Sequence, residues 1–182
     1  MQKIFAHLFR LGIAISTISA ITASTLTLAQ PLPKIKAGLW ESTTITEGGD
    51  AAKTKGNQMK TQVCMNDEVM SRMIKMGQSM TEGMCSKQDF SMRGKIATGS
   101  VECKLGSSIM RSNSVTTFTN DTAYRTESTA TFTPPMMGMK ESKTTVNAIH
   151  IGACRADMKP GDMMMNGKKV NLLDMAKSAA KK

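Results

Sequence analysis

Four cysteines follow an N-terminal export signal in this chain, and together they limit the folds it can adopt. Residues 1–29 begin with Lys3 and Arg10, continue with an apolar stretch at 11–28, and end in small residues. This order is typical of a secretory signal peptide, so we expect cleavage after Ala29 and a mature chain in the periplasm. An uncleaved membrane anchor is the alternative, since about 18 apolar residues can span a bilayer, but the many Ser and Thr residues weaken it.

All four cysteines, Cys64, Cys85, Cys103 and Cys154, lie beyond the expected cleavage point. An even number of cysteines in an exported chain favours disulfides. A zinc site is the alternative, but zinc ligands usually come in short-spaced pairs, and the only histidine near a cysteine is His150. We therefore predict two disulfides and no cofactor. No second hydrophobic run follows the first, so we expect no transmembrane span after signal removal.

The mature chain alternates and turns like an antiparallel β protein. β-branched residues are frequent at 37–47, and Arg93-Gly94-Lys95 and Asn120-Asp121 form short turns between alternating segments. Further strands are expected at 85–92, 96–105, 109–119, 122–132 and 142–153. The predicted fold is mainly β: an antiparallel meander that forms a curved sheet or partial barrel, with one short α-helix between the first and second strands.

The predicted helix covers residues 67–76. Asn66 can cap its free amide groups, and two acidic residues follow at the positive end of the helix dipole. Gly77 is expected to end it. One apolar stripe at helical spacing is formed by Val69, Met70, Met73 and Ile74.

A two-residue turn at Asn120-Asp121 would set the register of the hairpin around it. The numbers of facing residues then sum to 241, so Ile109 faces Phe132 and Val115 faces Thr126. Arg125 and Glu127 would lie on the opposite face of the sheet, and a slip by one residue would exchange the faces.

The direction of a meander favours one of the three pairings that four cysteines allow. Cys85 and Cys103 are placed symmetrically about Gly94, so they would face each other in one hairpin. Cys154 closes the last strand at the opposite end of the sheet, where Cys64 could also lie. This argument favours Cys85–Cys103 with Cys64–Cys154. If the sheet is not a meander, Cys64–Cys85 with Cys103–Cys154 is the second choice.

Several short segments occur in a characteristic order: Lys36-Ala37-Gly38-Leu39-Trp40-Glu41, Gln62-Val63-Cys64-Met65, Cys85, Arg93-Gly94-Lys95, Val101-Glu102-Cys103 and Ile151-Gly152-Ala153-Cys154. This order resembles DUF3617, a family of bacterial exported proteins of unknown function, over residues 33–154. The resemblance implies an envelope location and a mostly β domain at 30–154, between the signal peptide and the tail. It implies no catalytic residue.

The tail at 155–182 looks like an addition to that family pattern. It is rich in Met and Lys, and we expect it to be weakly ordered, with a short helix at 170–181. The whole chain has a formal net charge of +10. In an exported protein this charge favours anionic envelope components over nucleic acid as partners, and salt would screen the attraction.

Methionine is unusually frequent, with 18 residues in the chain. Thioether sulfur suits Cu(I) and Ag(I), so a metal-binding protein is the alternative function. Methionine as an adaptable filler of a core with few aromatic residues is the simpler interpretation. The candidate metal ligands are therefore weak ones: Met136, Met137, Met139, Met163, Met164 and Met165.

No constellation in the sequence supports catalysis, so we predict that the protein is not an enzyme. A Gly-x-Ser-x-Gly elbow and a Gly-rich phosphate loop are both missing from the sequence. Asp67 and Glu68 are explained by the start of the helix, and His150 by a structural hydrogen bond. The expected role is binding of an envelope component or small apolar ligand on the concave face of the sheet. A deep pocket lined by Trp40, Tyr124 and Phe132 would support it.

Overall fold

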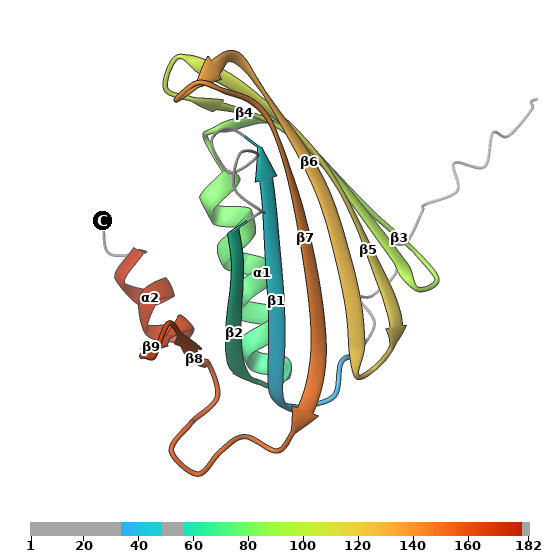
Figure 1. Cartoon of the computed structure of the whole chain (residues 1–182), viewed down its shortest axis with the longest axis vertical. Helices are drawn as coiled ribbons and strands as arrows, with labels where there is room; N and C mark the ends of the chain where they lie inside the picture. The colour runs from blue at the N-terminus through green and yellow to red at the C-terminus, as the bar shows by residue number, and fades with distance from the viewer. Residues whose placement is uncertain (1–33, 49–56, 180–182) are drawn as a thin grey trace, which may run out of the picture.

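The computed structural model describes residues 34–48 and 57–179. Within these ranges the chain forms one open antiparallel sheet in the order β3-β4-β5-β6-β7-β1-β2-β8-β9 (Figure 1). The predicted mainly β fold with a short helix is confirmed. The strands are β1 (Gly38–Gly48), β2 (Asn57–Met65), β3 (Cys85–Arg93), β4 (Ile96–Leu105), β5 (Ser108–Asn120), β6 (Ala123–Met136), β7 (Met139–Gly152), β8 (Asp162–Met165) and β9 (Lys168–Asn171). The helices are α1 (Asp67–Thr81) and α2 (Leu172–Ala179).

The position of the helix is a correction, because α1 lies between β2 and β3 and not between the first two strands. Strand β2 was not predicted from the sequence. It pairs along its whole length with β1, from Gly38 opposite Met65 to Thr46 opposite Asn57. The meander therefore runs from β3 to β7, and β1 then joins β7 to β2. Strand β2 does alternate, with Met59, Thr61 and Val63 on one face and Lys60 and Gln62 on the other, but with so few apolar side chains this is a weak strand signal.

Helix α1 begins where the sequence predicts and ends later. The side chain of Asn66 accepts a hydrogen bond from the backbone N of Val69 at 2.9 Å, as expected of an N-cap. The helix continues through Gly77 to Thr81, so the predicted end at Met76 is wrong. Gly83, with φ of +80°, provides the left-handed residue that a helix end favours.

The register of the β5–β6 hairpin differs by one residue from the prediction. Phe118 lies opposite Tyr124, and the chain bulges between Phe118 and Asn120. The side chain of Asn120 accepts a hydrogen bond from the backbone N of Thr122 at 2.9 Å, which stabilises a tight turn beyond the bulge. Arg125 and Glu127 stay on the predicted face. The residues of β5 exchange faces, so Val115 lies opposite Glu127 and not opposite Thr126. Strand β7 begins earlier than predicted, at Met139, and β6 extends past the prolines to Met136.

In its described part, residues 155–179, the tail after Cys154 forms two strands and a helix, whereas the sequence predicts one short helix. Strand β8 pairs with β2, and β9 pairs with β8. Asn166 and Gly167 both have positive φ, at 50° and 75°, which is the conformation of a two-residue hairpin turn. The side-chain oxygen of Asn171 then accepts hydrogen bonds from the backbone N of Leu173 and Asp174, and so caps α2.

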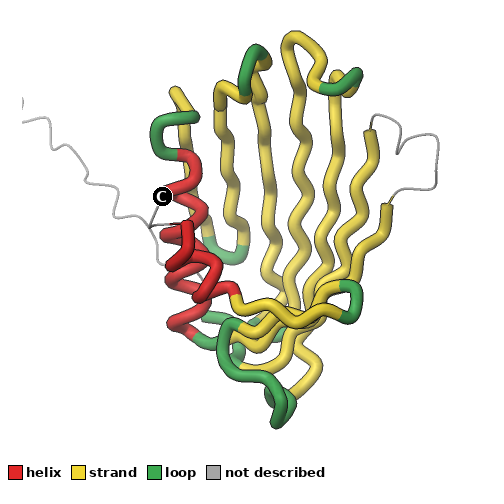
Figure 2. The backbone as a smooth tube through the Cα atoms, turned by 90° about the vertical axis from the view of Figure 1, so that its left-hand side faces the viewer, coloured by secondary structure: helices red, strands yellow, loops and turns green. Residues whose placement is uncertain are grey.

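Two small cores lie on opposite faces of the β1–β2 region. On the face toward α1, Trp40, Met65, Val69 and Ala148 form one buried cluster. On the other face, the chain that follows β7 covers a second cluster of Leu39, Cys64 and Met158. Figure 2 shows that the helices lie against one face of the sheet and cover only part of it. The rest of that face is the candidate site.

Candidate functional site

We call the face of the sheet that carries Trp40 and packs on α1 the inner face. Because side chains alternate along each strand, the register assigns every paired residue to one of the two faces. Two rows of facing residues cross the centre of the inner face, Thr116–Thr126–Val146–Thr44 and Ser114–Ser128–Thr144–Thr46. We call the hydroxyl side chains there the hydroxyl belt: Ser42, Thr44, Thr46, Ser112, Ser114, Thr116, Thr126, Ser128, Ser142 and Thr144.

Charge is segregated between the two faces of this sheet. In strands β1 to β7, every charged residue except Lys140, at the tip of the β6–β7 hairpin, takes a register position on the outer face. The paired positions of the inner face carry only uncharged side chains and His150. The outer-face charges are Glu41, Glu47, Lys60, Lys87, Asp89, Arg93, Glu102, Lys104, Arg111, Arg125, Glu127, Glu141 and Lys143.

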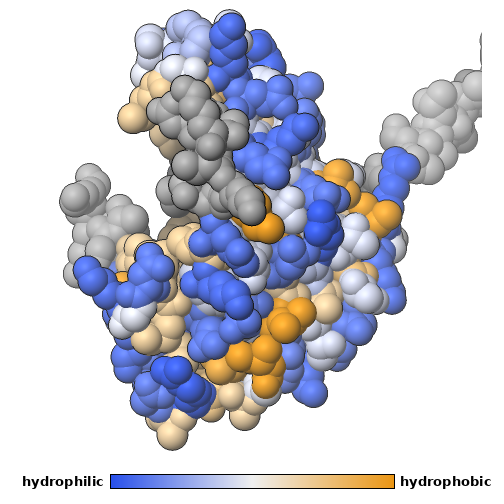
Figure 3. All heavy atoms as spheres, in the orientation of Figure 1, coloured by the Kyte–Doolittle hydropathy of each residue, from blue (hydrophilic) through white to orange (hydrophobic). Residues whose placement is uncertain are grey.

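The outer face is built to meet water. Arg111 binds Glu102 at 2.8 Å and Arg125 binds Glu127 at 2.8 Å, both as exposed ion pairs. The hydrogen bond and charge of Arg125 lower the pKa of the Glu127 carboxyl. In Figure 3, hydrophilic residues cover most of the visible side of the molecule, and hydrophobic residues form small separate areas. Three large apolar side chains, Ile96, Val115 and Ile149, are also exposed on this face among the charged residues.

Some hydroxyl groups of the belt form hydrogen bonds with other side chains of the inner face. The hydroxyls of Ser42 and Thr61 are 2.6 Å apart, and those of Thr116 and Thr126 are 2.8 Å apart, so each pair forms a hydrogen bond across two strands. All belt residues are half-buried. Small side chains leave room in front of the strands, and internally bonded hydroxyls lose little when water is displaced. The bonded hydroxyls of Ser42, Thr116 and Thr126 can therefore contact an uncharged group without a large desolvation cost.

An aromatic group closes the belt at the α1 end. The Trp40 ring lies 5.6 Å from Tyr124, and Tyr124 lies 5.7 Å from Phe118, measured between ring centroids. Trp40 is buried, and its Nε1 donates a hydrogen bond to the backbone O of Lys36 at 2.8 Å. Burial raises the pKa of the Tyr124 hydroxyl, so it stays protonated and neutral at physiological pH.

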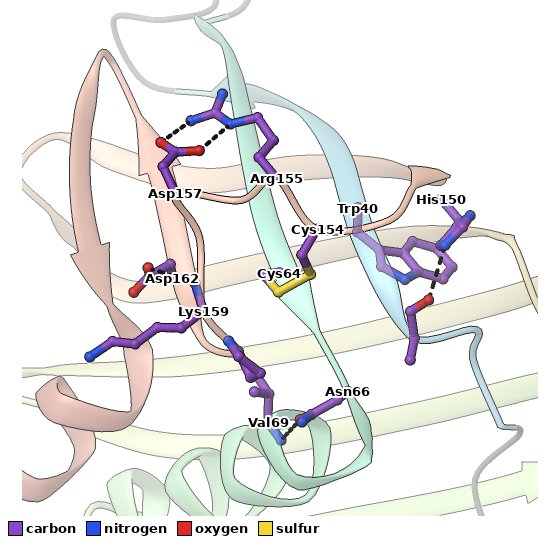
Figure 4. Close-up of a disulfide and its surroundings, with 12 residues drawn as sticks. Trp40, Cys64, Asn66, Val69, His150, Cys154, Arg155, Asp157, Lys159 and Asp162 are labelled. Carbon is purple, nitrogen blue, oxygen red and sulfur yellow. Dashed lines mark hydrogen bonds and ion pairs between the residues drawn. A yellow bond between two sulfur atoms is a disulfide. The ribbon is translucent and has the colours of Figure 1, made fainter.

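His150 belongs to this aromatic group. Its Nε2 lies 3.1 Å from the backbone O of Ala37, and its ring meets Trp40 edge-on (Figure 4). A Cβ at Gly38 would collide with the His150 ring, so the close approach requires glycine there. The arrangement places His150 in a structural role, against the first strand.

The expected pocket of Trp40, Tyr124 and Phe132 is not formed. Tyr124 and Phe132 are eight residues apart on β6, which is about 27 Å at 3.4 Å per residue. Trp40 and Tyr124 do contact each other, but Phe132 is buried at the far end of the strand, opposite Met110. The three aromatic residues therefore do not line one deep apolar pocket, and the inner face is open where the helices do not cover it.

A separate groove lies beside α1. It has a volume of about 340 Å³ and opens to solvent. Its walls mix apolar residues of α1 with charged ones, and the lining residues are Lys34, Ile35, Asp67, Met70, Ser71, Ile74, Lys75 and Gln78. This groove was not foreseen from the sequence, because Lys34 and Ile35 come from the segment before β1.

The two groups of candidate metal ligands are at opposite ends of the sheet. Met136 faces Met139 across the β6–β7 hairpin, and Met137 at its tip is 98% exposed. Met163 to Met165 lie in β8 beside Thr61 to Val63, where Met164 packs against the Leu39 cluster. His150, which could add a nitrogen ligand, is eleven positions from Met139 along β7, about 37 Å. In the described part of the chain no group of three His, Cys, Asp or Glu residues could hold a metal ion.

The disulfides are Cys64–Cys154 and Cys85–Cys103, the pairing that the strand directions favoured. Cys64–Cys154 ties β2 to the chain that follows β7 (Figure 4). Cys85–Cys103 joins β3 and β4 at the first pair of their ladder. Over residues 34–48 and 57–179, no helix is long and apolar enough to cross a membrane.

Comparison with known proteins gives one family match. The sequence model of DUF3617, described as a protein of unknown function, matches residues 35–154. A search of the curated proteins finds no match. The matched range runs from the residue before the Trp40 segment to the second cysteine of the Cys64–Cys154 disulfide, and it leaves the β8–β9–α2 tail outside. The chain therefore belongs to the DUF3617 family.

Proposed function

We propose that this protein is exported to the periplasm and there binds an uncharged, elongated amphiphile along its inner face, without catalysing a reaction. The signal-like sequence at 1–29, which lies outside the described residues, supports export. Two disulfides support it as well, since they persist in oxidising compartments. The ligand class follows from the chemistry of the inner face.

The observation that carries the proposal is the segregation of charge. A charged ligand on the inner face would lose hydration and meet no opposite charge, which is costly. An uncharged ligand avoids this cost, and the methyl and methylene groups of the belt offer it apolar contact. Because the helices cover only part of the inner face, a long molecule can lie along the strands (Figure 2).

Binding can be tested with the uncharged fluorescent probe N-phenyl-1-naphthylamine, whose emission rises in apolar surroundings. We expect saturable binding to the wild-type chain. Ser128→Glu, which puts a charge in the centre of the belt, should weaken binding at least about tenfold, or about 1.4 kcal/mol. Thr129→Glu is the matched control, because Thr129 is the next residue on β6 and points to the outer face.

Control measurements show whether a loss of binding in Ser128→Glu comes from misfolding. Circular dichroism should be the same for both variants, and each variant should have the mass expected for its own chain with two disulfides. Ser114→Asp, on the neighbouring strand of the same row, should repeat the loss if Ser128→Glu proves unstable. Equal binding by the two variants, or no saturable binding by the wild type, would contradict the proposal.

A second candidate, Cu(I) or Ag(I) binding, is favoured only by the β6–β7 hairpin. There Met136 and Met139 face each other on one side of a two-residue turn. Calorimetric titration with Cu(I) under reducing conditions tests it. Tight binding that disappears on replacing Met136, Met137 and Met139 by Leu would support a metal site, and the same replacement at Met163 to Met165 separates the two groups.

A further inference from the structure

The two outermost strands of the sheet differ in how well they are protected. Strand β9 is four residues long and carries Lys168 and Lys169, and short, charged strands discourage pairing with other chains. Strand β3 is nine residues long and pairs only with β4 among the described strands. Its Phe90 side chain is 66% exposed and lies over Gly99, where a Cβ would come within 3.0 Å of the ring. Strand β3 is therefore a long edge with an exposed aromatic side chain.

We propose that β3 pairs edge to edge with β3 of a second copy of this chain. The two strands run antiparallel, with Ser91 of one copy opposite Ser91 of the other. The two-fold axis then stands perpendicular to the sheet, so both inner faces lie on the same side. This assembly is a symmetric dimer, whose interface is self-complementary by construction. It does not depend on ligand binding to the inner face.

The side chains of β3 select this register. In this register the numbers of two facing residues add up to 182. Phe90 of each copy then lies opposite Met92 of the other on the inner face, and Asp89 of each copy lies opposite Arg93 of the other on the outer face. Apolar pairs and opposite charges directly across two strands are both stabilising. The exposed Phe90 is covered by the second copy in this arrangement.

Neighbouring registers are less favourable. A sum of 180 places Lys87 opposite Arg93, and a sum of 178 places Asp89 opposite Asp89, so each brings like charges together. A sum of 176 pairs Lys87 with Asp89 but places Phe90 opposite Ser86, where the β3–β4 register shifts. Only the Ser91-centred register combines opposite charges with the apolar pair in the regular part of β3.

Charge reversal tests the interface directly. The purified chain should show concentration-dependent dimerisation in sedimentation velocity. Arg93→Asp or Asp89→Arg alone turns two attractive pairs into two repulsive ones, and we expect association to weaken at least about tenfold. The double variant Asp89→Arg with Arg93→Asp restores opposite charges and should return to within about threefold of the wild type.

Cross-linking tests the register. Ser91→Cys should give a disulfide-linked dimer under mild oxidation, because the two residues lie across the symmetry axis. Thr117→Cys, exposed on the outer face of β5, is the control and should stay monomeric. Mass spectrometry checks that both native disulfides remain. A wild type that is monomeric at its highest soluble concentration, a double variant that is not rescued, or equal cross-linking of both cysteine variants would overturn the proposal.

Discussion

The end of the sheet around Trp40 and the hydroxyl belt are built in opposite ways from the same strands. At the Trp40 end, neighbouring residues of β1 are buried on both faces: Leu39 is 6% exposed and Trp40 is 4% exposed. Helix α1 covers one face there, and the chain after β7 covers the other. We call this region the covered end. In the belt, no described element covers the strands closely enough to bury a side chain fully.

This difference separates the residues that stabilise the fold from the proposed binding surface. Burial of apolar area is the main stabilising contribution to folding, and it is concentrated in the covered end. The belt contributes backbone pairing but little buried apolar area, so its side chains can change without unfolding the protein. Such a division lets a small domain hold an open surface, because one end fixes the curvature and position of the strands. Four predictions test it, from the largest effect on stability to the smallest.

The two disulfides should differ in their effect. Cys64–Cys154 spans 90 residues and Cys85–Cys103 spans 18. In the chain-entropy model these loops correspond to about 4.6 and about 3.2 kcal/mol. Replacing Cys64 and Cys154 by Ser should therefore lower the free energy of unfolding more than replacing Cys85 and Cys103, as measured by urea denaturation. A larger loss on removing Cys85–Cys103 would show that the disulfide outside the covered end stabilises the fold more.

Aromatic residues at the two locations should also differ. Trp40→Ala removes a buried ring and should cost about 3–5 kcal/mol. Phe90→Ala, at the exposed edge of β3, should cost less than about 1 kcal/mol. Urea unfolding of the two variants at low protein concentration, where the chain is monomeric, measures both. Similar losses would show that the sheet has no single stabilising end.

Several local features of the fold could be predicted from the sequence. The Asn66 cap, the turn at Gly94 and the symmetric positions of Cys85 and Cys103 are local signals, and each indicates one structure. The tail hairpin had an equally clear signal in Asn166-Gly167, but its methionines and lysines looked like a disordered composition. For this segment the turn residues indicate the structure better than the composition does.

The belt and its register were harder to predict. The usual strand signal is alternation between apolar and polar residues, whereas β6 alternates between hydroxyl or small side chains and charged ones, as in Thr126, Glu127 and Ser128. The bulge next to Asn120 shifts β5 by one residue, and nothing in its residue types marks the extra residue. Strand β2 depends on long-range pairing with β1, which a local pattern does not contain.

Asp162, in the tail next to the covered end, should make part of the stability depend on pH. It is 4% exposed, and its carboxylate accepts hydrogen bonds from Asn171 Nδ2 at 2.8 Å and from the backbone N of Lys159 at 3.0 Å. These bonds lower its pKa. The ionised Asp162 therefore adds fully to the free energy of unfolding above the ordinary aspartate pKa of about 3.9. This stabilisation is lost as the pH falls through the lowered pKa of the folded state. Asp162→Ala should cost about 1–3 kcal/mol at neutral pH.

The pH dependence shows how much of the effect of Asp162→Ala comes from the lost carboxylate charge and how much from lost packing. The difference in unfolding free energy between wild type and Asp162→Ala should shrink between pH 5 and pH 3, as measured by urea titrations at each pH. Asp157, an exposed residue paired with Arg155, is the matched control. Its substitution by Ala should change stability much less than Asp162→Ala does, because solvent screens an exposed ion pair. A pH-independent effect at Asp162 would mean that its hydrogen bonds do not stabilise the tail.

The smallest effect is expected in the belt itself. Thr126→Val keeps the shape of the side chain and removes the 2.8 Å hydrogen bond with Thr116. Because the site is half-buried and water can reach the remaining hydroxyl, the loss should stay below about 1 kcal/mol. Thr129→Val, on the outer face of the same strand, provides the baseline for a hydroxyl that faces solvent. A loss above about 2 kcal/mol at Thr126 alone would show that the belt is part of the stabilising core, and the inner face would then be a packing surface instead of a binding surface.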